Sequence, residues 1–234
     1  MVHLGNSRLL VKICAALLVA SMCLCLAAGC SDGGHGGPVE TQTPAQTPEP
    51  APADTPEPDE GCDALFYGDS ITAGNNFDEF FPQLRVVDLG INGATIEDLT
   101  ERVPEVSAHH PAKIFVMAGG NNLYSGNVEE CVELFRGLLD ALGEACPYAE
   151  IFVESMLPFD KAVAARFDCP NRVVRGYNER LQELAEEYGM PYLDIYPAYE
   201  YHGGLNSDMT EDGIHLKYDC YGPWAEILRP YLEP

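Results

Sequence analysis

Short apolar runs alternate with longer amphipathic stretches from residue 64 to the C-terminus. The apolar runs are five to eight residues long, which is typical of strands buried on both faces of a sheet. They are ALFYG (64–68), RVVDLG (85–90), KIFVMAG (113–119), EIFVESML (150–157) and MPYLDIY (190–196). Apolar residues at three- and four-residue spacing predict helices at 95–103, 127–145, 171–189 and 221–232. This alternation predicts a parallel sheet covered on both faces, and right-handed crossovers then give a three-layer α/β/α sandwich.

The first thirty residues have a different pattern, which is typical of a targeting segment. Arg8 and Lys12 precede the apolar stretch LLVASMCLCLAA, which is short for a membrane span of about 20 apolar residues. The ending LAAGC resembles a bacterial lipobox, although Leu26 lies one place earlier than usual. We therefore expect residues 1–30 to be a lipoprotein-type signal peptide that ends at a lipid-modified Cys30, with secretory cleavage near Ala28 as the alternative.

A linker and one domain follow. Residues 31–60 contain seven prolines, four threonines and four glycines, and such a composition predicts a mobile, acidic tether. Residues 61–234 have the length of a single domain with one core. We expect this domain to be held at the extracytoplasmic side of a membrane, facing the periplasm or the cell surface.

The charge balance limits the partners of the chain. It carries 37 acidic against 13 basic side chains and a net charge of −24. Such an acidic surface argues against binding to nucleic acid and against direct adsorption to anionic lipid. We expect a monomer that reaches a membrane only through its N-terminal lipid anchor. Ordinary solubility explains the charge equally well.

Five cysteines follow Cys30: Cys62, Cys131, Cys146, Cys169 and Cys220. Export permits disulfides, but an odd number leaves at least one thiol unpaired within the chain, and the connectivity stays open. Their spacing fits no metal site. None is flanked by the glycine and histidine blocks described below, so we expect neither a metal nor a cysteine nucleophile.

Two motifs at opposite ends of the domain offer the parts of a nucleophilic site. GDSITAG begins at Gly68 and contains Ser70, while DGIH holds Asp212 and His215 three residues apart. A serine needs a base to take its proton, and the base works best when an acid fixes its tautomer. Each motif alone is also a common turn composition, so the prediction depends on the segments between them.

Those segments offer hydrogen-bond donors for a developing oxyanion. The stretch VVDLGINGAT supplies the backbone N–H of Gly93, and KIFVMAGGNNLYSG supplies the side-chain amide of Asn121. Each follows a predicted strand, as Ser70 does, so all three should meet at the carboxyl edge of the sheet. The loop LPFDKAVAARFDCP should overhang the same edge. Candidate substrate contacts there are Tyr124, Phe159 and Phe167, with loop packing as the alternative.

These four blocks, in this order, resemble the SGNH hydrolases, also called GDSL esterases and lipases. In that family Ser70 corresponds to the nucleophile, Asp212 and His215 to the acid and base, and Gly93 and Asn121 to oxyanion donors beside the N–H of the serine. The resemblance runs from about residue 63 to the C-terminus. It implies a flavodoxin-like five-stranded parallel sheet of order 2-1-3-4-5, and no metal or organic cofactor.

Some positions leave alternatives open. The third block of the family usually reads Gly-x-Asn-Asp, and here its last position is Asn122. Ser70 can also be interpreted as a helix cap. His202 is the rival base and Asp208 the rival acid.

The sequence thus predicts a two-step serine esterase. Export and a tether favour O-acetyl or other short-chain esters on carbohydrate or cell-envelope glycan, and the partner is then a small-molecule or glycan ester. One alternative is a lysophospholipase or short-chain lipase. A second is a surface binding lipoprotein that keeps the fold without turnover.

Overall fold

The computed structural model describes residues 61–124 and 127–233, all within the unit Ala53–Pro234. The signal peptide, Cys30 and the tether therefore lie outside the described residues. The domain has a five-stranded parallel sheet of order β2-β1-β3-β4-β5, which confirms the expected topology. Its strands are β1 (Ala64–Gly68), β2 (Val86–Gly90), β3 (Lys113–Met117), β4 (Glu150–Glu154) and β5 (Tyr192–Leu193).

The register brings the carboxyl ends of the central strands to one edge. Gly68 at the end of β1 pairs with Gly90 of β2 and with Met117 of β3. All five residues of β1 are buried, whereas β2 is an edge strand and only partly covered. The fifth strand is two residues long, so the predicted strand over 190–196 is mostly irregular backbone.

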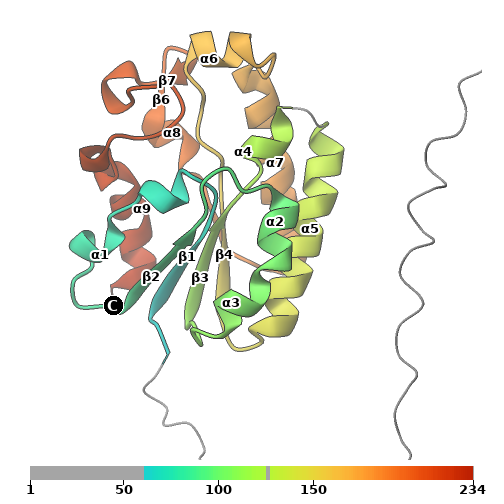
Figure 1. The fold of residues 1–234 in the computed structure, drawn as a ribbon, viewed down its shortest axis with the longest axis vertical. Coiled ribbons are helices and arrows are strands. Elements are labelled where there is room, and N and C mark those ends of the chain that lie inside the picture. The colour runs from blue at the N-terminus through green and yellow to red at the C-terminus, as the bar shows by residue number, and fades with distance from the viewer. Residues whose placement is uncertain (1–60, 125–126, 234) are drawn as a thin grey trace, which may run out of the picture. The chain divides into compact units, whose positions relative to one another are not determined.

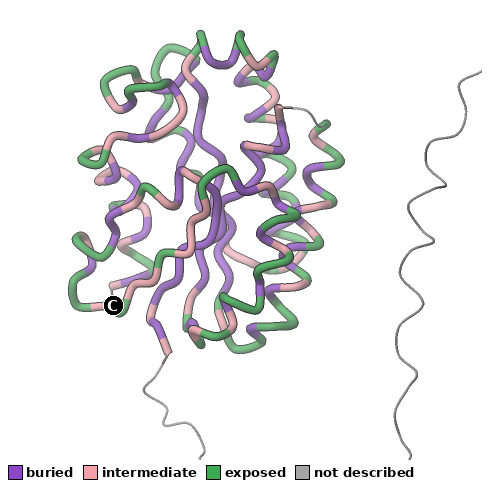
Figure 2. Tube along the Cα trace, viewed as in Figure 1, coloured by how far each residue is buried: buried purple, intermediate pink, exposed green. Residues whose placement is uncertain are grey.

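Helices cover both faces of the sheet, as Figure 1 shows. On one side lie α1 (Phe77–Phe80) and α9 (Gly222–Leu232), and α8 (Tyr196–Tyr199) packs against α9. On the other lie α2 (Ile96–Glu101), α3 (Val103–Ser107) and α5 (Val128–Ala145), and α7 (Asn171–Tyr188) packs against α5. The buried residues follow the strands and the inner faces of these helices, while exposed residues lie on the outside (Figure 2). The three-layer sandwich is confirmed.

The predicted helix over 95–103 is wrong at its end, because the structure has two short helices there. The side chain of Thr95 accepts a hydrogen bond from the Asp98 N–H, and Asp98 caps Thr95 in return, so α2 begins in a capping box. Pro104 lies in the first turn of α3. Proline has no N–H to donate and restricts the residue before it, which favours a helix start at this point over a continuation of α2.

Other elements were not predicted, because short elements leave little periodicity in a sequence. The loop expected over 157–170 contains α6 (Lys161–Arg166), where the Asp160 side chain accepts a hydrogen bond from the Ala162 N–H at 2.8 Å. The remaining short elements are α4 (Gly120–Leu123), the hairpin of β6 (Glu200–Tyr201) and β7 (Gly204–Leu205), and the 3-10 helices η1 (Thr72–Gly74), η2 (Ser207–Met209) and η3 (Tyr218–Cys220).

A buried carboxyl group lies among the aromatic side chains under α9. Glu154, at the end of β4, is 1% exposed, and its Oε1 accepts a hydrogen bond from the Trp224 indole N–H at 2.8 Å. Its other oxygen, Oε2, has no hydrogen-bond partner among the described residues. Burial raises the pKa of Glu154 to about 8, and the bond from Trp224 only partly opposes this. The carboxyl group is therefore neutral near pH 7.

Glu154 makes the stability of the domain depend on pH. The pKa of Glu154 in the folded state lies above the ordinary value of 4.5. The contribution of this group to the free energy of unfolding is therefore fully present below pH 4.5 and is lost as pH rises toward about 8. The loss is at most about 1.4 kcal/mol per pH unit. Glu154→Gln, which does not titrate, should flatten this slope in urea denaturation between pH 5 and pH 8. Burial also raises the pKa of Asp69, but Asp69 is present in both wild type and Glu154→Gln. Equal slopes of stability against pH in the two proteins would therefore contradict the assignment to Glu154.

Candidate active site

The turn after β1 presents Ser70 at the carboxyl edge of the sheet. A Cβ atom on Gly68 would lie 2.2 Å from the Thr72 Oγ1, and one on Gly90 would lie 2.1 Å from the Ala73 backbone nitrogen. Glycine at both positions therefore lets η1 approach the strand ends closely. Ser70 itself is half-buried.

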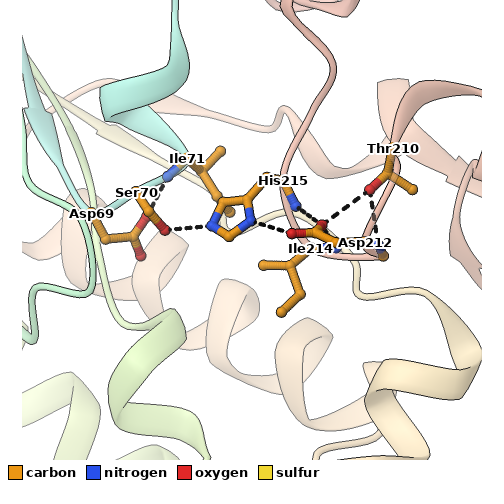
Figure 3. A network of polar contacts seen from close by, with 8 residues as sticks. Asp69, Ser70, Ile71, Thr210, Asp212, Ile214 and His215 are labelled. Atoms are coloured by element: carbon orange, nitrogen blue, oxygen red, sulfur yellow. Dashed lines mark hydrogen bonds and ion pairs between the residues drawn. The ribbon is translucent and has the colours of Figure 1, made fainter.

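Ser70, His215 and Asp212 form a continuous chain of hydrogen bonds (Figure 3). The Ser70 Oγ lies 2.8 Å from the His215 Nε2, and the His215 Nδ1 lies 2.6 Å from the Asp212 Oδ2. Both distances suit proton transfer through the imidazole ring. The structure therefore brings together the nucleophile, base and acid that the sequence predicts.

The loop that carries His215 holds Asp212 in place. The Asp212 Oδ1 accepts hydrogen bonds from the backbone N–H groups of Ile214 and His215, at 2.9 and 2.8 Å. The Thr210 hydroxyl donates to the same oxygen at 3.4 Å and accepts from the Gly213 N–H at 2.9 Å. Desolvation acts to raise the pKa of Asp212, but the hydrogen bonds from His215 and Ile214 outweigh it and lower the pKa to about 2. The carboxylate that contacts the imidazole is therefore ionised near neutral pH.

Asp69, directly before Ser70, is a second acid at this site that the sequence reasoning missed. It is 2% exposed, and its Oδ1 accepts the Ile71 N–H at 3.0 Å, across the serine (Figure 3). Burial raises its pKa to about 6, against the lowering effects of the Ile71 N–H and of His215. The available signal was a charged residue placed immediately after a fully apolar strand.

Gly93 and Asn121 lie beside each other, as their motif positions predict. Gly93 has a φ of +76° in a turn that the Ala94 N–H closes onto the Ile91 oxygen at 3.1 Å. A Cβ atom on Gly93 would meet nothing within 4 Å, so this face of the turn is open. The Asn121 Nδ2 donates to the Ala94 oxygen at 2.8 Å. An amide nitrogen carries two N–H groups, so the second is available to a ligand.

The rival base His202 and the rival acid Asp208 lie outside the chain of hydrogen bonds that starts at Ser70. His202 is in the turn between β6 and β7, where its ring packs against Tyr201 with 4.0 Å between ring centroids. The Asp208 N–H bonds the Asn206 side chain, and its backbone oxygen accepts from Lys217. The hydrogen bond of Ser70 to an imidazole goes to His215.

The three candidate substrate contacts form one aromatic cluster. The Tyr124 ring lies 5.4 Å from that of Phe159 and 4.5 Å from that of Phe167, measured between centroids. Phe159 is 2% exposed, and this burial favours the alternative of loop packing for its ring. Tyr124 and Phe167 are half-buried. Burial raises the pKa of the Tyr124 hydroxyl to about 12, and the nearby charges of Asp69 and Asp212 add to this shift.

A cavity of about 640 Å³ opens beside the imidazole. It is lined by Glu211, Asp212, His215, Leu216, Lys217, Tyr218 and Asp219. Tyr218 is 61% exposed, and its hydroxyl donates to the Glu79 Oε1 of α1 at 2.5 Å. The lining therefore combines an accessible aromatic ring with acidic side chains and one lysine.

The described residues contain five cysteines, and all five have free thiols. Four of them are buried, and only Cys220 is partly exposed. Within the described ranges no three His, Cys, Asp or Glu side chains gather in a way that fits a metal ion. No helix in this part of the chain is long and apolar enough to span a membrane.

Comparisons with known proteins give a family match and similar folds. A model of the GDSL-like Lipase/Acylhydrolase family matches residues 66–221. A solved GDSL-like lipase from Bacteroides thetaiotaomicron is 22% identical, with a TM-score of 0.63 over 73% of this chain and 87% of that one. A catalytic variant of an acetylxylan esterase from Geobacillus stearothermophilus is 20% identical, with a TM-score of 0.60 over 74% and 95%. At these sequence identities, the two solved structures show only that this chain shares their fold.

A curated relative is longer than this chain. N-acylneuraminate cytidylyltransferase of Streptococcus agalactiae serotype V is 26% identical over 157 residues. The match covers 67% of this chain but 35% of that protein, so the chain spans about a third of its length.

Proposed function

The chain belongs to the GDSL-like lipase/acylhydrolase family, and we propose that it is a carboxylic ester hydrolase whose catalytic triad is Ser70, His215 and Asp212. The observation that carries this proposal is the unbroken chain of contacts from the Ser70 Oγ through the imidazole to the Asp212 carboxylate, at 2.8 and 2.6 Å. A surface protein that only binds its ligand has no need of this arrangement.

The reaction proceeds in two steps. The Ser70 Oγ attacks the ester carbonyl while the His215 Nε2 takes its proton, and Asp212 stabilises the resulting imidazolium. His215 then protonates the alcohol oxygen as the ester C–O bond breaks, which leaves an acyl-enzyme. Water, deprotonated by His215, hydrolyses this intermediate and releases the acid. The backbone N–H groups of Ser70 and Gly93, with the Asn121 amide, stabilise the oxyanion in both steps.

Kinetics of two histidine variants test the assignment of the base. His215→Ala should lower kcat on p-nitrophenyl acetate by about 10³-fold or more, because the serine loses its proton acceptor. His202→Ala should stay within about twofold of wild type, since its ring contacts Tyr201 and not Ser70. The reverse pattern would make His202 the base.

For the substrate, we propose O-acetyl or other short-chain esters of carbohydrate or cell-envelope glycan. Since His215 protonates the leaving oxygen, the alcohol must lie on the imidazole side, where the 640 Å³ cavity opens. Carboxylates there accept hydrogen bonds from hydroxyl groups, and the exposed Tyr218 ring offers a flat face to a sugar ring.

The same lining disfavours a lysophospholipid as substrate. Leu216 is the one aliphatic residue among the seven that line the cavity, so an apolar alcohol group gains little there. Glu211, Asp212 and Asp219 would repel the phosphodiester of a lysophospholipid. The acetylxylan esterase with the same fold acts on an acetylated glycan, which is consistent with this proposal.

A panel of esters tests the substrate class. Wild type should hydrolyse acetylated oligosaccharides with a higher kcat/KM than esters of C8 to C16 acids. Tyr218→Ala should lower kcat/KM for the oligosaccharide by about tenfold through the lost ring contact, yet leave ethyl acetate within about twofold. Tyr148→Ala is the matched control, because that ring is 98% exposed between α5 and β4. A preference for long acyl chains would favour the lipase alternative.

We also propose export and anchoring through Cys30. The support is the sequence pattern of a positive segment, an apolar stretch and a terminal cysteine within residues 1–30. Mass spectrometry of the mature protein should find an N-terminal Cys30 carrying acyl chains. An unmodified Cys30, or a mature chain that starts elsewhere, would contradict the anchor.

A further inference from the structure

We propose that Asn122 and Glu97 are positioning residues that set the geometry between Gly93 and Asn121. This inference rests on the oxyanion roles proposed above for those two residues. Asn122 stands where the family resemblance leads one to expect aspartate, and the structure gives the asparagine side chain a specific task.

Two consecutive asparagines reach from α4 to the segment that follows Gly93. The Asn121 Nδ2 donates to the Ala94 oxygen at 2.8 Å. The Asn122 Oδ1 accepts the Ile96 N–H at 2.9 Å, and its Nδ2 donates to the Glu97 Oε2 at 2.7 Å. Three hydrogen bonds thus join α4, which carries Asn121, to the segment that follows Gly93, and Asn122 is buried there.

The amide of Asn122 satisfies both of its contacts, whereas an ionised carboxylate would satisfy only one. The backbone N–H of Ile96 needs an acceptor, while the Glu97 carboxylate needs a donor, and asparagine offers both. The bond from Asn122 is the largest cause of the lowered pKa of Glu97, so the partner is ionised and the bond is charge-assisted. An aspartate at this position would place two carboxylates against each other at the start of α2.

Misplacement of this segment should affect the chemical step rather than binding. An oxyanion donor acts only when it lies about 2.7–3.1 Å from the developing charge, and a 1 Å displacement is enough to cost about 10²-fold in rate. The cavity proposed to hold the alcohol is lined by a different segment, residues 211–219. A shift at the start of α2 should therefore lower kcat and leave KM nearly unchanged.

A set of four variants tests the pair, with kcat and KM measured on p-nitrophenyl acetate. Asn122→Asp should lower kcat by about tenfold to a hundredfold with KM within about twofold. Adding Glu97→Gln to it should restore most of the lost kcat, because the new amide donates to the new carboxylate. Glu97→Ala alone should lower kcat about threefold to tenfold, since Asn122 loses its acceptor. Glu101→Ala, an exposed acid on the same helix, is the control and should match wild type.

Two outcomes would overturn the inference: a double variant no faster than Asn122→Asp, or a Glu97→Ala variant with wild-type kcat. Glu97 is exposed, so its alanine variant still tests the pair if Asn122→Asp does not fold, which thermal denaturation would reveal. Failure of the proposed function is a separate result. It would appear as full activity in Asn121→Ala, or as no ester hydrolysis by the wild type.

Discussion

The structure of the site depends on one hydrogen bond, between the Ser70 Oγ and the His215 Nε2, which joins residues 145 positions apart in the chain. The serine reaches it because glycines at the ends of β1 and β2 let the turn approach the sheet edge closely. The histidine reaches it because Asp212 binds both its ring and its backbone N–H. The first strand and the last loop of the domain therefore meet at a single imidazole ring.

Three carboxyl groups near this edge differ in ionisation because their surroundings differ. Hydrogen bonds lower the pKa of Asp212 to about 2, whereas burial raises that of Asp69 to about 6 and that of Glu154 to about 8. Desolvation favours the neutral form, and donors aimed at the carboxylate favour the ionised one. Asp212, the proposed orienting acid, is therefore the one group of the three whose pKa lies well below neutral pH, so it stays charged where Glu154 is neutral.

Periodicity predicted the parallel sheet and both helical layers, and motif spacing predicted the residues that meet at the edge, because both are local properties of a single chain. The strand order was implied only by the family resemblance, and the structure confirms it. The sequence did not predict α6 or the break before α3, which depend on one capping side chain and one proline. It also missed Asp69 and the contact of Asn122 with Glu97. Burial and side-chain pairing arise only when distant segments pack, so composition and spacing do not reveal them.

The most direct test of this account is the site at which a fluorophosphonate probe labels the folded protein. Peptide mass spectrometry after a timed reaction should find the adduct on Ser70, because that hydroxyl has an imidazole nitrogen at 2.8 Å to take its proton. Ser70→Ala should remain unlabelled. An adduct on another residue, or a wild-type protein that hydrolyses esters without labelling at Ser70, would contradict the central claim.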